Sequence, residues 1–390
     1  MKTVKRWGFA AVFLGLAACA RPVVDTQGRP AAPGMIADPD MSVLRPQYER
    51  DPASWPKPTL DAGIGHRELG LVVAPPRDTG AQAQARVDLG QMLFFDGRLS
   101  GTGQMACASC HDAELGFGDG RATSFGHGAL PLARNAPTLW NVGQRKAWFW
   151  DGRADSLEAQ ADMVLANARE MGNEPEVIVA TVKSSKGYRE RFAAAFGTDE
   201  VSLERILQAI AAFERTLVSD GSSDFDHFLS GDRAALSDSA VRGLHLFRTK
   251  ARCINCHNGP LLTDEQFHNL GLTYYGRELE DLGRYNVTKE PADVGRFRTP
   301  SLRNLGRTGP YMHNGLFELK GVINMYSAGM PRVEPTEEQK ADPLFPVKSP
   351  ILQRLDLTQE EKSDLEAFLL SLTERKRRIR APELPPIGDA

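Results

Sequence analysis

The 390-residue chain has little net charge, few cysteines and no long apolar segment beyond its N-terminus. Its 47 Lys and Arg residues against 50 Asp and Glu give a formal charge of −3, which gives no reason to expect a nucleic-acid partner. No segment after the N-terminal one approaches the apolar length that spans a bilayer. The hydrophobic content of 41% is ordinary for a globular protein. The length therefore predicts two soluble domains with appendages.

Four of the five cysteines form two copies of one short pattern, at Cys107–His111 and Cys253–His257. Each copy has two cysteines three apart with a histidine directly after. This pattern attaches c-type haem, because two thiols form thioethers to the porphyrin and the next imidazole binds the iron. Zinc and a disulfide are the alternatives, but zinc sites seldom have this histidine, and a disulfide leaves it unexplained. The predicted attachment residues and iron ligands of two covalent haem c groups are Cys107, Cys110, His111, Cys253, Cys256 and His257.

The N-terminus has the pattern of a targeting segment. A basic start with Lys2 and Lys5 precedes the apolar segment Phe9–Ala18, and Leu16–Cys19 is similar to a bacterial lipobox. This predicts a signal peptide over 1–18 and a lipid on Cys19 that holds the protein to a membrane. A plain secretory signal is the alternative. Both place the protein in the periplasm, and Ala20 favours the outer membrane over the inner one.

Apolar residues at helical spacing predict a mostly α protein with long loops. Leu203 to Leu217 form a strongly amphipathic pattern, and Thr358 with Glu361 forms a capping box before a terminal helix. The Arg- and Lys-rich end after that helix is expected to be a solvated tail. The predicted organisation is a tether and wrapping arm over 19–82, haem domains over 83–230 and 231–380, and a tail over 381–390.

A faint internal repeat supports two related haem domains. Gly90 and Phe94 precede the first cysteine pattern, and Gly243 and Phe247 precede the second. The repeat therefore predicts that each of the two haem domains is mostly helical with long loops.

From Gln82 to about Arg332 the chain resembles the bacterial di-haem cytochrome c peroxidase and MauG family. The resemblance rests on Phe149–Gln160 (FWDGRADSLEAQ), Cys253–Pro260 (CINCHNGP) and Thr308–Gly315 (TGPYMHNG). The N-terminal arm looks closest to the quinol-peroxidase branch, although the extra haem motif of that branch is missing. The resemblance implies two cytochrome c-like haem domains, with a peroxidatic haem in the first and an electron-transfer haem in the second.

The resemblance also implies roles around the first haem. His127 matches a removable sixth iron ligand, and its state at rest stays open. Trp150 matches an indole that relays electrons between the haems. Gln160 matches an amide that hydrogen-bonds the bound oxygen species, and Glu170 matches the carboxylate that moves the proton during O–O cleavage.

The sixth ligand of the second haem is left open by the resemblance. The family position falls on Tyr326 if one residue is missing from the preceding loop, and Met325 and Met330 flank it. Met330 is one helical turn beyond Tyr326, so both side chains can face the same haem.

A calcium ion between the domains is also implied by the resemblance. Asn135, Thr308 and Pro310 match its protein ligands, and oxygen ligands suit this hard cation.

Three functions follow from these expectations. The first is a peroxidase that reduces hydrogen peroxide to water with electrons from a small cytochrome c, a cupredoxin or a quinol. The second is a MauG-like enzyme that uses peroxide to oxidise a partner protein. The third is a di-haem electron carrier without turnover. A homodimer is expected by resemblance only.

Overall fold

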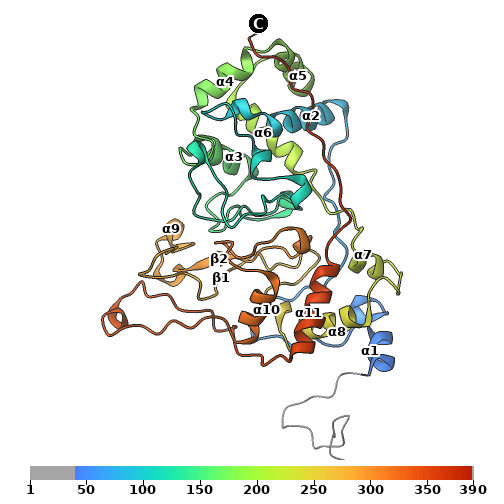
Figure 1. The fold of residues 1–390 in the computed structure, drawn as a ribbon. Helices are drawn as coiled ribbons and strands as arrows, with labels where there is room; N and C mark the ends of the chain where they lie inside the picture. The colour runs from blue at the N-terminus through green and yellow to red at the C-terminus, as the bar shows by residue number, and fades with distance from the viewer. Residues whose placement is uncertain (1–39, 389–390) are drawn as a thin grey trace, which may run out of the picture. The chain divides into compact units, whose positions relative to one another are not determined.

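The computed structural model describes residues 40–388, and this part of the chain is mostly helical (Figure 1). One antiparallel sheet joins β1 (Phe267–Asn269) to β2 (Arg296–Arg298), with Phe267 opposite Arg298. The mostly α prediction is confirmed. The signal peptide, Cys19 and the tether up to residue 39 lie outside the described residues. The helices are α1 (Met41–Tyr48), α2 (Ala81–Phe95), α3 (Leu157–Ala166), α4 (Pro175–Lys183), α5 (Lys186–Phe196), α6 (Leu203–Glu214), α7 (Asp224–Leu229), α8 (Asp238–Arg248), α9 (Tyr285–Thr288), α10 (Leu319–Ser327) and α11 (Gln359–Ser371).

Helices α2 to α6 form a first helical group, and α7, α8, α10 and α11 form a second. In the first group, α2 crosses α6 at Gly90. A Cβ atom at Gly90 would lie 1.8 Å from the carbonyl oxygen of Ala209, so the backbones meet where only glycine fits. One turn later Phe94 packs against Phe213 with ring centroids 5.2 Å apart. Both phenylalanines are buried in the core. The crossing fixes the end of α2, from which the chain enters the turn at Cys107.

Helix α8 crosses α11 in the same way. A Cβ atom at Gly243 would lie 1.9 Å from the carbonyl oxygen of Asp364. Phe247 then packs against Phe368, again with centroids 5.2 Å apart. The repeat seen in the sequence is therefore a repeated helix crossing, and each copy precedes one cysteine pattern.

The capping box of the terminal helix is confirmed. The Oγ1 atom of Thr358 accepts a hydrogen bond from the Glu361 amide at 3.1 Å. The Glu361 carboxylate accepts one from the Thr358 amide at 2.7 Å. The two bonds satisfy amides that have no partner within the helix.

The N-terminal arm packs along the second group of helices. The buried guanidinium of Arg248 forms an ion pair with Glu68 and donates to the carbonyl oxygen of Pro56 at 2.6 Å. The Asn255 side chain donates to the carbonyl oxygen of Thr59 at 2.9 Å. Asn255 lies inside the second cysteine pattern, so the arm supports that turn directly.

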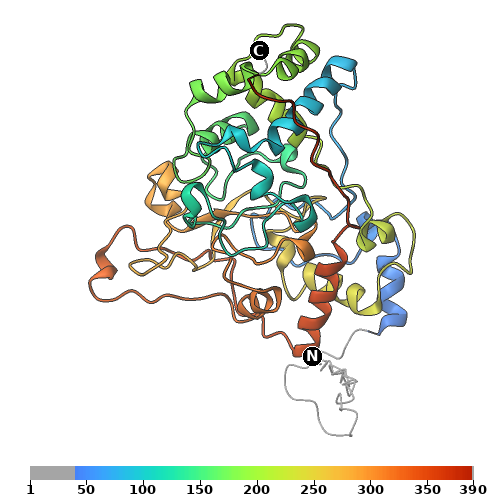
Figure 2. The same ribbon diagram turned by 45° about the horizontal axis from the view of Figure 1, so that its top comes forward.

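The C-terminal segment is not the solvated tail that its basic composition predicts. It returns along α2, α5 and α6 (Figures 1 and 2). Leu384 packs against the apolar core of the first helical group. Arg98 donates to the carbonyl oxygen of Pro385 at 3.0 Å, and Gln91 donates to that of Arg380 at 3.1 Å. Because backbone carbonyls make these bonds, side-chain composition did not indicate them. Among residues 40–388, no helix has the length and apolar character needed to cross a bilayer.

Candidate active site and haem cavities

The first cysteine pattern lies on the wall of a cavity in the first helical group. A 3₁₀ turn over Cys107–Ser109 brings Cys107, Cys110 and His111 to that wall. The His111 Nδ1 atom donates to the carbonyl oxygen of Phe117 at 2.9 Å, which leaves Nε2 as the free ring nitrogen. Burial lowers the pKa of His111 and so favours the neutral imidazole. A neutral ring with one free nitrogen is the form that binds a metal ion.

Gln160 and Glu170 line the same cavity. Gln160 projects from α3, which ends at Ala166, and Glu170 lies in the turn that follows. The side-chain amide of Asn167 donates to Glu170 Oε1 at 2.9 Å. Burial raises the pKa of Glu170, while the positive charge of Arg153 and the Asn167 bond oppose that rise. A raised pKa makes a carboxyl group a better proton acceptor, which suits general acid–base catalysis.

His127 lies beside this cavity but is absent from its described lining. Its amide donates to the carbonyl oxygen of Glu170 at 2.8 Å. Its ring packs against Gly172, where a Cβ atom would lie 3.1 Å from Nδ1. That Nδ1 atom is buried without a hydrogen-bond partner. His127 is therefore not part of the cavity wall in this conformation, and whether it binds the iron stays a prediction.

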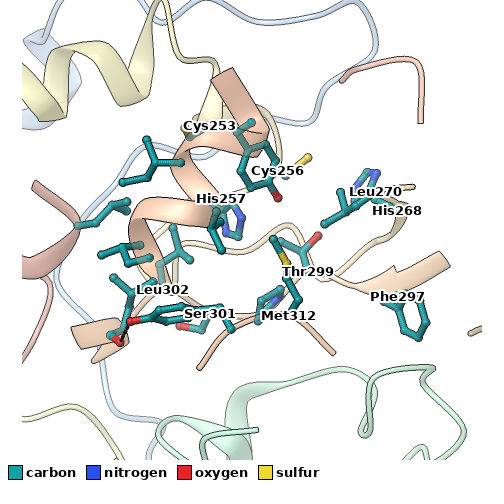
Figure 3. Close-up of a pocket in the computed structure, with 18 of the residues that line it drawn as sticks. Cys253, Cys256, His257, His268, Leu270, Phe297, Thr299, Ser301, Leu302 and Met312 are labelled. Carbon is teal, nitrogen blue, oxygen red and sulfur yellow. Dashed lines mark hydrogen bonds between the residues drawn. The ribbon is translucent and has the colours of Figure 1, made fainter. Parts of the chain in front are cut away.

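The second cysteine pattern lines a second cavity in the same manner. Cys253, Cys256 and His257 lie on its wall, and His257 Nδ1 donates to the carbonyl oxygen of Leu262 at 3.0 Å. Burial lowers the pKa of His257 as well. Figure 3 shows this cavity, with the three attachment residues on one side and Met312 on the other. The two turns therefore present the same chemical groups to two cavities.

Tyr326 lines the second cavity, whereas Met325 and Met330 are absent from its described lining. The expectation that Met330 shares a helix face with Tyr326 is wrong, because α10 ends at Ser327. Met330 follows in the left-handed region with φ 61°, which breaks the helical spacing. Burial, with the cysteine thiols nearby, raises the pKa of Tyr326. Met312 also lines this cavity. The sequence did not predict this position, because nothing in the Tyr-Met-His-Asn-Gly motif indicates that the methionine faces a cavity.

The two cavities share part of their walls. Trp150 lines both, and its indole N–H donates to the carbonyl oxygen of Asn135 at 2.9 Å. His313 also lines both, and its ring centroid lies 6.5 Å from that of Trp150. Phe297 stacks on His313 at 3.7 Å. An aromatic cluster thus lies between the cavities.

Two separate stretches of the chain supply the three residues predicted to bind calcium to the wall of the second cavity. Asn135 lies in the first stretch, and Thr308 and Pro310 lie in the second. The Asn135 side-chain nitrogen donates to the carbonyl oxygen of Arg121 at 2.9 Å, which leaves Oδ1 as the oxygen available to a cation.

The residues at both cavities fit covalent haem. The four cysteines are free thiols, and both cavities have largely apolar side chains around a fixed imidazole. The alternatives fit poorly. Among the described residues, the group that could hold a metal ion consists of Cys256, Asp264 and His268. This group uses one attachment cysteine and omits His257, so zinc does not explain the pattern.

Comparisons with known proteins agree with this geometry. The family model for di-haem cytochrome c peroxidase matches residues 84–234. The methylamine utilization protein MauG of Methylophilus methylotrophus is 39% identical over 307 residues, covering 77% of this chain and 86% of that protein. Cytochrome c551 peroxidase of Nitrosomonas europaea is 38% identical over 300 residues, covering 77% and 83%.

A solved structure supports the same assignment. The crystal structure of a MauG-like protein associated with microbial copper homeostasis superposes with a TM-score of 0.67 at 34% identity. It covers 81% of this chain and 96% of that one. Sequence relatives, fold and the two cavities agree that this chain is a c-type di-haem peroxidase of the cytochrome c peroxidase and MauG family.

Proposed function

We propose that the protein reduces hydrogen peroxide to water at the first cavity, with electrons that enter through the second. The observation that carries the proposal is that Gln160 and Glu170 line the cavity of His111, while Trp150 lines both cavities. Bound haem supplies an iron that binds peroxide and a porphyrin that carries electrons. The chain supplies proton transfer, orientation and the separation of the two centres.

Glu170 is the group that moves the proton. Its carboxylate takes a proton from one peroxide oxygen and delivers it to the other, which leaves as water. Two electrons and two protons convert one peroxide molecule into two waters. Gln160 orients the peroxide through its side-chain amide, and Trp150 lies where electrons cross between the haems.

A substrate experiment separates this function from its alternatives. Purified di-haem protein is given hydrogen peroxide with a reduced small cytochrome c, a cupredoxin or a quinol. Steady consumption of peroxide, with two electrons taken per molecule, is expected for the peroxidase and identifies the donor. Peroxide use only with stoichiometric modification of a partner protein indicates a MauG-like enzyme, and no use with any partner indicates an electron carrier.

We propose Tyr326 as the sixth ligand of the second haem. A tyrosine ligand at this position would favour the MauG-like function. The half-buried side chain of Tyr326 lies on the wall of the second cavity, whereas Met330 is buried and is not part of that wall. Tyr326→Phe should change the spectrum of the second haem, whereas Met330→Leu should leave it unchanged. Met312→Leu is the matched control within the cavity, and a change confined to that variant contradicts the choice of Tyr326.

A calcium ion bound through Asn135, Thr308 and Pro310 completes the site. Chelation should reduce turnover, and added calcium should restore it. Asn135→Ala should weaken this response, and a calcium-independent wild type refutes the site.

Anchoring in the outer membrane through lipidated Cys19 is also part of the proposal, supported by the sequence pattern alone. Cys19→Ser should release the protein from the membrane fraction into the soluble periplasm. Sedimentation of the released form measures whether it is a monomer or a homodimer.

A further inference from the structure

Arg145 is a cation on the wall between the two cavities. It lines both of them, together with Trp150 and His313. Burial lowers the pKa of His313 to about 4, so that imidazole is neutral. Among the described residues that line both cavities, Arg145 is therefore the one that carries a positive charge at neutral pH.

The guanidinium of Arg145 forms no ion pair in the described part of the chain, although Glu265 and Glu214 are near enough to act on its charge. The Arg145 Nη2 atom donates to the carbonyl oxygen of Thr138 at 2.6 Å. The neighbouring Arg298 differs, because its guanidinium lies 3.3 Å from Glu265. Burial, with the charge of Arg298 nearby, lowers the pKa of Arg145 to about 9. A guanidinium held in the protein interior without an anion is unfavourable.

Glu214 does not supply the missing anion. It is buried on the wall of the first cavity, and its Oε2 atom has no hydrogen-bond partner. Burial raises the pKa of Glu214 to about 8, so the carboxyl is mainly neutral at pH 7. The positive charge of Arg145 is therefore left for a group that enters the cavities.

We propose that Arg145 binds haem propionate groups and that its position on the shared wall makes it an electrostatic link between the two haems. Each haem brings two carboxylates, and the fork of a guanidinium matches carboxylate geometry. The inference rests on the two covalent haems and on no particular electron donor. Thr138 holds the arginine in place through its carbonyl oxygen.

The link has a redox consequence. A fixed positive charge near a haem favours its reduced state, because reduction adds an electron to the site. Loss of the charge should therefore make one or both haems harder to reduce. A tenfold change in the reduction equilibrium of a one-electron couple corresponds to 59 mV.

The experiment compares Arg145→Gln with Arg145→Lys and with Arg332→Gln in the full di-haem protein. The Arg332 side chain is 77% exposed and pairs with Glu334 at the surface, which makes it a matched control. Haem content is measured first, and the midpoint potentials follow by spectroelectrochemical titration. Arg145→Gln should lower at least one potential by about 59 mV, Arg145→Lys should lower it less, and Arg332→Gln should change neither.

Unchanged potentials in Arg145→Gln at full haem content overturn the proposal. If that variant does not bind two haems, resonance Raman spectra of Arg145→Lys provide the test. The propionate bending bands should shift, because lysine lacks the fork, and unshifted bands overturn the proposal. Wild-type turnover with peroxide is recorded separately, so failure of the peroxidase function and failure of this inference are distinguishable.

Discussion

Replacement of Glu170 by glutamine removes the proposed proton-transfer group and leaves the size of the side chain almost unchanged. Glutamine can keep a contact with Asn167, whose amide lies 2.9 Å from Glu170 Oε1. General acid–base catalysis contributes roughly 10²- to 10⁴-fold to the rate. Turnover should therefore fall by about that factor, while the haem spectra stay nearly unchanged. Glu176→Gln, at an exposed position in the first turn of α4, should retain full turnover.

The environment of Glu170 also sets the direction of its pH dependence. Glu170 must be ionised to accept a proton, and burial raises its pKa above the usual value. Turnover should thus decline as the pH falls through this raised pKa, and it should be retained above it. Asn167→Ala removes a donor that stabilises the carboxylate. The decline of turnover on the acidic side of the pH profile, its acid limb, should therefore move to higher pH.

The size of this second effect can be worked from the hydrogen bond. A bond to a charged group contributes about 1.5–3 kcal/mol, and one pKa unit corresponds to about 1.4 kcal/mol. The pH at which turnover falls on the acidic side should therefore rise by about one to two units in Asn167→Ala. The assay is steady-state peroxide consumption across pH with a reduced donor in excess. Undiminished turnover in Glu170→Gln, or an unmoved limb in Asn167→Ala, refutes the assignment of Glu170 as the proton carrier.

Two further predictions concern the folded framework. Gly90→Ala should destabilise the protein by about 1–3 kcal/mol through the clash between α2 and α6, whereas Gly321→Ala, which meets no atom within 4 Å, should be neutral or stabilising. Asp226→Asn should lower the free energy of unfolding by about 3–5 kcal/mol, because it leaves Arg303 buried without the carboxylate now at 2.7 Å. Asp356→Asn, at an exposed ion pair, should leave the urea midpoint unchanged. If Gly90→Ala and Gly321→Ala have the same urea midpoint, the close helix crossing is not required for stability. If Asp226→Asn and Asp356→Asn have the same midpoint, the buried ion pair is not required.

Local features of this protein could be predicted well from its sequence. The capping box of Thr358 and Glu361 involves residues three apart, and the haem turn at Cys107–His111 involves five consecutive ones. Their geometry depends on neighbours in the chain, which the sequence displays directly. The Gly90 and Gly243 repeat was also visible, although only the structure shows that each glycine admits a carbonyl oxygen of another helix.

Features that depend on distant contacts were missed or misjudged. The position of Met330 was judged from helical spacing, but α10 stops at Ser327 and the chain turns. Leu384 looked like part of a solvated tail, yet it packs on a core that is formed by the first helical group. Arg145 is not part of any motif recognised in the sequence. Its importance depends on which carboxylates lie near it after folding, and a sequence does not contain that information.

The wall that the two cavities share would let the two haem groups influence each other. The segment from Asn135 to Trp150 supplies residues to both cavities, and the indole of Trp150 is tied to Asn135 through its N–H. The same segment contains Arg145, so the proposed electron path and a positive charge lie within sixteen consecutive residues. Arg298 of β2 then joins this segment to the second helical group, since its amide donates to the Trp150 carbonyl oxygen at 2.8 Å. A change of charge at one haem therefore acts on a short piece of backbone that also borders the other haem.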